Sequence, residues 1–340
     1  MQRAALIGCG AMSRAWFEAA KTIDGLEIVG VADIDADRAA ARATEFGLGD
    51  VVIATSIEDL LAKAEPDILF DVVVPGARHH VVSAALAAGC HVLSEKPMAD
   101  SLDQARDLVA RARAADRLHV VIQNRRYLAA PRRIRRLIAS GAIGDVTSIH
   151  CDFFLGPHFG GFREEMNHVL LLDMAIHTFD AARFLAGAEP EGVYCREWEP
   201  KNSWYKQGSS AAAIFEFGDG VIFNYRGSWC ANGLGTSWES AWRITGTKGS
   251  LVWDGHDDIR AEIATGEIKG LFSEVAAVEI PPLDASDRTG GHLGLVQDFI
   301  AATRGGPVPE TVGSQNIKSL AMVFGAIESA TSGRRVEISV

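Results

Sequence analysis

Residues 5–13 read ALIGCGAMS, a short apolar run that ends in a glycine turn. Gly8 permits a tight turn at the end of a strand, and Gly10 lets a pyrophosphate approach the backbone where a helix begins. Ser13 stands at the third glycine position and is small enough to keep that helix close to the sheet. The stretch predicts the opening of a dinucleotide-binding fold. Its cofactor-binding residues are expected to be Gly8, Gly10, Ala11 and Met12.

Short apolar runs alternate with amphipathic, charged stretches over the first third of the chain. Continuous apolar strands that alternate with helices are typical of a parallel sheet covered on both faces. We therefore expect residues 1–122 to form a doubly wound α/β domain of the Rossmann type. The expected strands are ALIG (5–8), EIVGVAD (27–33), DILFDVVV (67–74), CHVLS (90–94) and LHVVIQ (118–123).

From residue 123 onward the pattern is different. Strand-like runs follow one another with little helix between them, and turns such as Gly218-Asp219-Gly220 favour hairpins. We expect residues 123–340 to form an α+β domain for substrate binding and oligomerisation, with a large, open, mostly antiparallel sheet. Helices are expected at 168–186, 291–304 and 314–331.

Asp33 closes the second expected strand, at the position of an acid that takes the ribose 2′-hydroxyl of a dinucleotide. No basic residue follows it directly, which favours NAD over NADP, although Arg38 keeps NADP open. Two other interpretations remain at this point. Asp33 could cap a helix that begins near Ala36, or the whole half could be a different dinucleotide-shaped domain such as a methyltransferase.

Composition excludes several classes of protein. The chain has 340 residues, of which 48% are hydrophobic and 23% are charged, as in a globular protein of two domains. The net charge of −11 argues against a nucleic-acid partner, because phosphate neutralisation needs a basic face. No apolar stretch is long enough for a membrane span or a signal peptide, so we expect a cytoplasmic protein. The five cysteines have neither disulfide nor zinc spacing.

Residues 170–180 read LLLDMAIHTFD, which places Asp173 and His177 in an apolar run. A buried carboxylate must be paired or face a cavity. On a helix the two residues share one face, and a carboxylate beside an imidazole fixes its tautomer and raises its basicity. This is equipment for general acid–base catalysis. A satisfied core pair is the bland alternative, and a metal site with His168 is another, although we expect no metal.

Residues 89–98, GCHVLSEKPM, place a lysine and a proline directly after a buried strand, where ligands bind in such folds. Together with the glycine turn, Asp33 and the Asp173–His177 stretch, this resembles the glucose–fructose oxidoreductase/inositol dehydrogenase (Gfo/Idh/MocA) family over essentially the whole chain. The resemblance implies a catalytic set of Lys96, Asp173 and His177. Ala175 replaces the usual glycine, and the loop VPGARHH lacks the common Thr-Pro-Asn. Further cofactor contacts are expected from Pro75, His79, Glu95 and Lys96.

Polar residues flank the second apolar run and could contact a substrate. The segment from Asn124 to Arg136 contains six arginines, the last of them Arg136 itself. An anionic substrate is one interpretation, and a solvated helix face with acidic partners is the other, favoured for the last four. Besides Lys96, Asp173 and His177, the substrate-site candidates are Arg125, Tyr127, His158, Glu165, Asn167 and His168.

These features predict an NAD-dependent dehydrogenase that acts on a CH–OH group of a sugar, polyol or cyclitol, as the resemblance implies. His177 is the first choice for the base, although Lys96 could serve instead. The alternatives are a redox-neutral, glycosidase-like enzyme that uses NAD transiently, and a non-catalytic dinucleotide-sensing subunit. Tryptophans in the second half suit sugar faces, a core or a subunit interface. We expect a homo-oligomer, a dimer or tetramer, through the antiparallel sheet.

Overall fold

The computed structural model describes all 340 residues, and the chain divides into two compact units. The first unit contains Met1–Tyr127 and Arg288–Ile317, and the second contains Leu128–Asp287 and Lys318–Val340. The sequence suggested one boundary, after residue 122. It gave no sign that a later segment returns to the first unit, because an amphipathic helix does not reveal which sheet it covers.

The first unit is built on a six-stranded sheet in the order β3-β2-β1-β4-β5-β6. The predicted parallel α/β sheet is confirmed, although the short strand β3 was not among the expected strands. Its strands are nearly all apolar because helices cover both faces. The strands are β1 (Gln2–Ile7), β2 (Leu26–Ala32), β3 (Val52–Ala54), β4 (Ile68–Asp71), β5 (His91–Ser94) and β6 (His119–Val121). The helices are α1 (Ser13–Lys21), α2 (Ala36–Glu45), α3 (Ile57–Ala64), α4 (Pro75–Ala87), α5 (Leu102–Ala114), α8 (His292–Thr303) and a short 3₁₀ turn, η1 (Asn124–Tyr127).

Helix α8 completes the core of this unit although it lies far along the chain. It contacts α1, and its Leu295, Val296, Phe299 and Ile300 belong to the same buried cluster as Trp16. The chain then adds Val312 to the edge of the sheet by an antiparallel bridge to Val120. The first unit is therefore completed by residues that lie, in the sequence, between β14 and β15 of the second unit's sheet.

The second unit contains a nine-stranded sheet in the order β14-β13-β12-β11-β7-β10-β9-β8-β15. Only the β7–β10 pair is parallel, so the prediction of a mostly antiparallel sheet is confirmed. The strands are β7 (Val146–Phe154), β8 (Pro190–Trp198), β9 (Ser210–Phe217), β10 (Ile222–Ser228), β11 (Ala241–Gly246), β12 (Gly249–Trp253), β13 (Ile259–Lys269), β14 (Phe272–Val278) and β15 (Val336–Glu337). The helices are α6 (Ala129–Ala139), α7 (Ile176–Ala186) and α9 (Gly313–Ser332), with short turns at η2 (Gly161–Arg163), η3 (Leu170–Ala175) and η4 (Gly218–Gly220).

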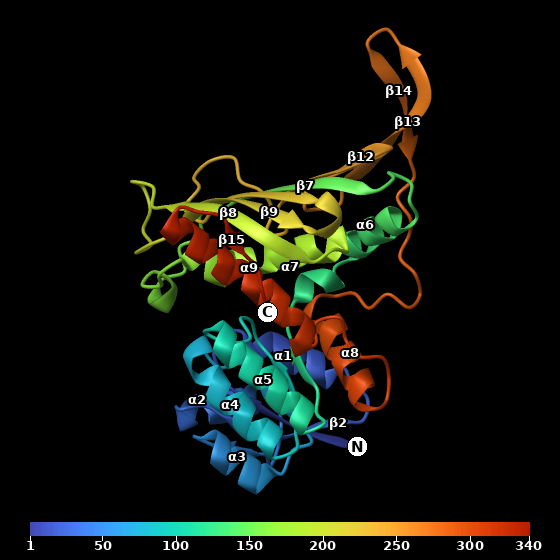
Figure 1. Ribbon diagram of the computed structural model, residues 1–340. Coiled ribbons are helices and arrows are strands. Elements are labelled where there is room, and N and C mark those ends of the chain that lie inside the picture. The colour runs from blue at the N-terminus through green and yellow to red at the C-terminus, as the bar shows by residue number, and fades with distance from the viewer. The chain divides into compact units, whose positions relative to one another are not determined.

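One face of this sheet packs against helices and the other is open. On the packed face, Phe179 of α7 meets Phe215 of β9 and Tyr225 of β10 edge to face. Trp242 and Trp253 stack on each other and are buried as well. The tryptophans of β11 and β12 are therefore core residues, and Trp198 of β8 is 44% exposed. At one end of the sheet, β13 and β14 project as a long hairpin (Figure 1).

No helix of the chain combines the length and the apolar character needed to cross a bilayer.

Candidate active site

The glycine turn lies between β1 and α1 as predicted, and its two glycines serve different purposes. Gly8 has φ +97°, and a Cβ there would lie 2.6 Å from the carbonyl carbon of Val72. Glycine is thus required by both the backbone conformation and the close approach of β4. A Cβ on Gly10 would meet no atom within 4 Å. The space beside Gly10, at the start of α1, is open for a ligand.

Asp33 is tied to this turn. One carboxylate oxygen accepts the Cys9 amide at 2.8 Å, and the other accepts the Asp35 amide at 3.0 Å and the Arg38 guanidinium at 3.3 Å. Asp35 is the residue that caps α2, since its side chain accepts from the amides of Asp37 and Arg38. The helix-cap interpretation of Asp33 is therefore not needed. The open space at Gly10 and the acid at the end of β2 fit the phosphates and ribose of a dinucleotide.

The Glu95-Lys96-Pro97 loop follows β5 at the carboxyl edge of the parallel sheet. Glu95 is buried and accepts the Trp16 indole N–H at 2.9 Å, while His292 of α8 lies 3.5 Å from the same oxygen. Burial alone would raise the pKa of Glu95, but His292, Trp16 and the charge of Lys96 outweigh it and lower that pKa. Glu95 thus remains a carboxylate, and its other oxygen accepts the Lys96 amide at 3.2 Å. The glutamate anchors the loop that presents Lys96.

Pro75 and His79, both expected at the cofactor, lie in the first turns of α4, which follows β4. Pro75 is the first residue of α4, where its ring suits a first helical turn. His79 Nε2 lies 2.7 Å from a carboxylate oxygen of Asp107 in α5, a hydrogen-bond contact between two partly exposed side chains. The structure thus gives His79 a structural partner, and its assignment to the cofactor stays a prediction.

In the second unit, the Asp173–His177 stretch begins with a π-helical turn. Leu170–Ala175 is π-helical and α7 starts at Ile176, so the expected continuous α-helix from residue 168 is wrong in this detail. Such insertions occur frequently at functional sites because they redirect a side chain. Asp173 is buried in the π-turn, and His177, the second residue of α7, is half-buried. That Asp173 and His177 share one face of a helix stays a prediction.

Asp173 has an ion-pair partner that the sequence did not indicate. Arg163 donates from Nε to Asp173 Oδ2 at 2.7 Å. The guanidinium lies 5.1 Å from the ring centre of Phe159 and 4.9 Å from that of Phe162, both of which are about half exposed. Two aromatic faces therefore hold Arg163 in place by cation–π attraction. The carboxylate that the resemblance assigns to catalysis is compensated by a fixed cation.

Other substrate-site candidates lie on the segment between β7 and the π-turn. His158 stacks on Trp204 with ring centres 3.7 Å apart. Glu165 and Asn167 are exposed to solvent. His168 donates from Nδ1 to Glu197 Oε2, 2.6 Å away on β8, and this hydrogen bond raises the pKa of His168. His168 also adopts φ 54°, a backbone region that favours glycine.

The arginine-rich segment divides between the two units. Arg125 and Tyr127 are buried in η1 of the first unit. In α6, Arg133 donates to the Pro281 carbonyl, and Arg136 pairs with Asp284 and Asp287. The acidic partners of Arg136 agree with the interpretation of a solvated helix face, whereas Arg133 bonds main-chain carbonyls and Arg132 lies over the ring of Phe184.

The structure also shows functional-site residues that the sequence analysis missed. Trp16 and His292 hold Glu95, Arg163 holds Asp173, and Glu197 holds His168. The structure also shows an ion pair between Asp71 and Arg78. The sequence pointed to a partner only for Asp71, since an aspartate inside the apolar run DILFDVVV must be compensated. No sequence pattern links the other pairs.

Comparison with known proteins agrees with these features. Residues 2–123 match the oxidoreductase family with an NAD-binding Rossmann fold, and residues 132–252 match the GFO/IDH/MocA C-terminal domain. The chain belongs to the GFO/IDH/MocA family. An uncharacterized protein of Sinorhizobium fredii is 30% identical, covering 98% of this chain and 94% of its own length. The 1,5-anhydro-D-fructose reductase of Ensifer adhaerens is 29% identical, covering 99% of both chains.

Among solved structures, an oxidoreductase from Agrobacterium radiobacter in complex with NAD⁺, L-tartaric acid and magnesium superposes with a TM-score of 0.85. It is 24% identical and covers 99% of this chain and 98% of its own. At this identity the likeness concerns the fold. This GFO/IDH/MocA protein is thus an oxidoreductase with an NAD(P)-binding Rossmann domain.

Proposed function

We propose that the chain is an NAD-dependent dehydrogenase that oxidises a CH–OH group of a sugar, polyol or cyclitol. The observation that carries this proposal is the arrangement at the carboxyl edge of the parallel sheet. An open helix start at Gly10, an acid fixed at the end of β2 and an anchored lysine at position 96 occupy the edge where such folds bind cofactors.

NAD is favoured because Asp33 is oriented by two backbone amides. Its carboxylate can accept from a ribose 2′-hydroxyl and repels a 2′-phosphate. Arg38 pairs with Asp33 but is half exposed, so it is the residue that could turn toward a 2′-phosphate. NADP is therefore the second cofactor to test.

The proposed chemistry uses the three residues that the family resemblance implies, Lys96, Asp173 and His177. NAD, when bound, would supply the hydride acceptor for the substrate carbon. We assign removal of the hydroxyl proton to His177, with Asp173 stabilising the charged imidazole and Lys96 stabilising negative charge on the substrate oxygen. The alternative mechanism to be tested makes Lys96 the base and leaves His177 to stabilise the negative charge on the substrate oxygen. His158, Glu165, Asn167 and His168 are assigned to the remaining hydroxyls, and Arg125, Tyr127, Pro75 and His79 stay candidates.

The substrate class has its support from the relatives. The similar protein of Ensifer adhaerens is a 1,5-anhydro-D-fructose reductase, an enzyme that acts on a keto sugar. The half-exposed Phe159 and Phe162 lie against Arg163, the ion-pair partner of Asp173, and suit the apolar C–H faces of such a ring.

The test is a screen of sugars, polyols and cyclitols with NAD and with NADP, followed by the absorbance of the reduced nicotinamide. A dehydrogenase gives one reduced cofactor per substrate consumed. A redox-neutral, glycosidase-like enzyme would cleave a glycoside with no net reduced cofactor. A dinucleotide-sensing subunit would bind cofactor and turn over none of these compounds.

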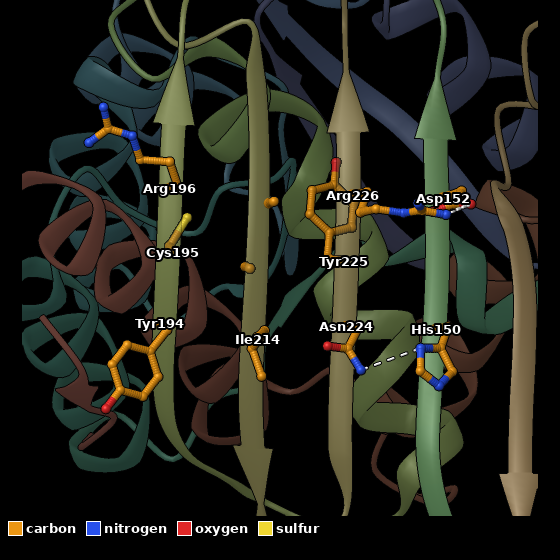
Figure 2. A pocket seen from close by; sticks show the side chains of 11 residues that line it. His150, Asp152, Tyr194, Cys195, Arg196, Ile214, Asn224, Tyr225 and Arg226 are labelled. Atoms are coloured by element: carbon orange, nitrogen blue, oxygen red, sulfur yellow. Dashed lines mark hydrogen bonds and ion pairs between the residues drawn. The ribbon is translucent and has the colours of Figure 1, made fainter. Parts of the chain in front are cut away.

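We also propose that a second copy of the chain covers the open face of the second unit's sheet. Cross-strand register places Tyr194 beside Ile214, and Figure 2 shows both pointing outward with Arg226 and Asp152 from the neighbouring strands. Tyr194 and Ile214 are about half exposed and line a hollow of about 570 Å³. Apolar side chains grouped in this way are typical of a subunit interface.

Ile214→Glu should shift the mass in solution to that of a monomer, because it buries a charge in the proposed contact. Val308→Glu, at an equally exposed apolar residue of the first unit, should leave the mass unchanged. A wild-type monomer at micromolar concentration would exclude this assembly.

A further inference from the structure

A buried ion pair lies at the carboxyl edge of the parallel sheet in the first unit, next to the loops that follow β4 and β5. Asp71 ends β4 and is fully buried, and Arg78 of α4 is 1% exposed. The Arg78 Nε donates to Asp71 Oδ2 at 2.8 Å. A buried ion pair adds little net stability, because the cost of removing both charges from water offsets their attraction. Removal of one partner is destabilising, because it leaves the other charge buried and uncompensated. Its presence in an otherwise apolar layer calls for another explanation.

The remaining donors of Arg78 supply that explanation. Nη1 donates to the Pro97 carbonyl at 2.5 Å, and Nη2 donates to the Val73 carbonyl. Pro97 follows Lys96 directly, whereas Val73 lies in the loop that leads to Pro75. A single planar guanidinium therefore ties the loop after β4 to the loop after β5. Only arginine has donors in this fork geometry.

Asp71 fixes the orientation of that fork. Its Oδ1 accepts the Val73 amide at 3.1 Å, and its main-chain carbonyl accepts the Glu95 amide at 2.8 Å. Burial raises the pKa of Asp71, while Arg78, the Val73 amide and Ser94 oppose the shift by stabilising the carboxylate. Ser94 in turn bonds His119 of β6, so the network reaches a third strand.

We infer that Arg78 is a positioning residue, which holds the Lys96–Pro97 loop at a fixed distance from the Val73–Pro75 loop. This inference rests on the proposed function, because it assigns Arg78 a role through Lys96. The residue before Lys96, Glu95, is held by Trp16, and the residue after it, Pro97, is held by Arg78. Lys96 lies between these two anchors, so the loss of one should let its ammonium group move by a fraction of an ångström or more.

Three variants separate positioning from stability. Arg78→Lys keeps a positive charge for Asp71 but cannot bond both carbonyls. Its turnover should fall roughly 10- to 100-fold, as expected for a small misplacement of a catalytic group, with KM for NAD little changed. Asp71→Asn keeps Arg78 on both carbonyls and should lose less turnover than Arg78→Lys. Arg117→Met is the control, since Arg117 bonds the Gly89 carbonyl at the amino edge of the same sheet and should affect only the melting temperature.

A second measurement does not depend on turnover. Trp16 donates to Glu95, so its fluorescence reports the position of the same loop. Because the chain has seven tryptophans, the Trp16 signal is taken as the difference between each protein and the same protein carrying Trp16→Phe. Emission and its quenching by NAD should change in Arg78→Lys and stay at wild-type values in Arg117→Met, while Lys96→Met is assayed in parallel. Unchanged Trp16 emission together with wild-type turnover in folded Arg78→Lys would overturn the inference. Full turnover in Lys96→Met would instead refute the proposed role of Lys96, whereas a changed Trp16 signal in Arg78→Lys would still support the tie between the loops.

Discussion

Alanine at Gly8 should lower the stability of the protein, whereas alanine at Gly10 should weaken its binding of the cofactor, although the two glycines stand only two residues apart. At Gly8 the backbone has φ +97°, and the new Cβ would lie 2.6 Å from backbone atoms of Val72. The left-handed conformation costs about 1–2 kcal/mol, and the forced shift of a packed strand costs about 1–3 kcal/mol. Gly8→Ala should therefore lower the free energy of unfolding by roughly 2–5 kcal/mol.

At Gly10 the same methyl group would meet no atom of the protein within 4 Å. Stability should stay within about 0.5 kcal/mol of wild type. The methyl group would occupy the space that the cofactor phosphates need, so affinity for NAD should fall at least about tenfold, which corresponds to roughly 1.4 kcal/mol.

Thermal melting and a fluorescence titration with NAD, on the same samples, distinguish these two effects. Gly8→Ala should melt several degrees lower, since about 1 kcal/mol shifts Tm by roughly 2–4 °C in a domain of this size. Gly10→Ala should melt like wild type and bind NAD weakly. Wild-type affinity in Gly10→Ala would show that the space beside α1 is not the phosphate site, and an undiminished Tm in Gly8→Ala would refute the steric argument.

Three further predictions concern the polar residues. Asp33→Ala should weaken binding of NAD far more than binding of NADP in parallel titrations, and equal losses would mean that Asp33 only braces the glycine turn. His177→Ala should lower turnover by roughly two to four orders of magnitude with NAD affinity unchanged, and Asp173→Asn combined with it should add little. A folded His177→Ala enzyme with full single-turnover rate would refute the assignment. Glu197→Gln should lower Tm more at mildly acidic than at alkaline pH. The pKa of His168 is raised in the folded state, so the stabilisation is present below the unfolded pKa of about 6.5 and is lost as pH rises through the folded value. A loss of Tm that is equal at both pH values would contradict this.

The sequence predicted those parts of the fold that depend on local pattern. Gly8, Asp33 and Lys96 stand at the ends of apolar strands, and parallel strands bring their carboxyl ends to one edge. The alternation of runs in the second half likewise predicted an antiparallel sheet. These are consequences of spacing along a short stretch of chain.

Partners from distant segments could not be predicted in this way. Nothing near Glu95 in the sequence points to Trp16 or His292, and nothing near Asp173 selects Arg163 among the many arginines. The π-helical turn was missed because its apolar residues also fit an α-helix. Trp242 and Trp253 alternate with their neighbours as exposed residues also would. Only the folded structure, in which Trp242 stacks on Phe223 and on Trp253, shows that they are buried.

The return of residues 288–317 to the first unit has a consequence for protein engineering. A fragment that ends after residue 122 would lack Leu295, Val296, Phe299 and Ile300, and would leave the aromatic ring of Trp16 without part of its core. Anyone who grafts this cofactor-binding unit onto the sheet of a relative must exchange two pieces of gene together. Recombination at a single crossover would produce a chimera whose halves come from different parents within one core.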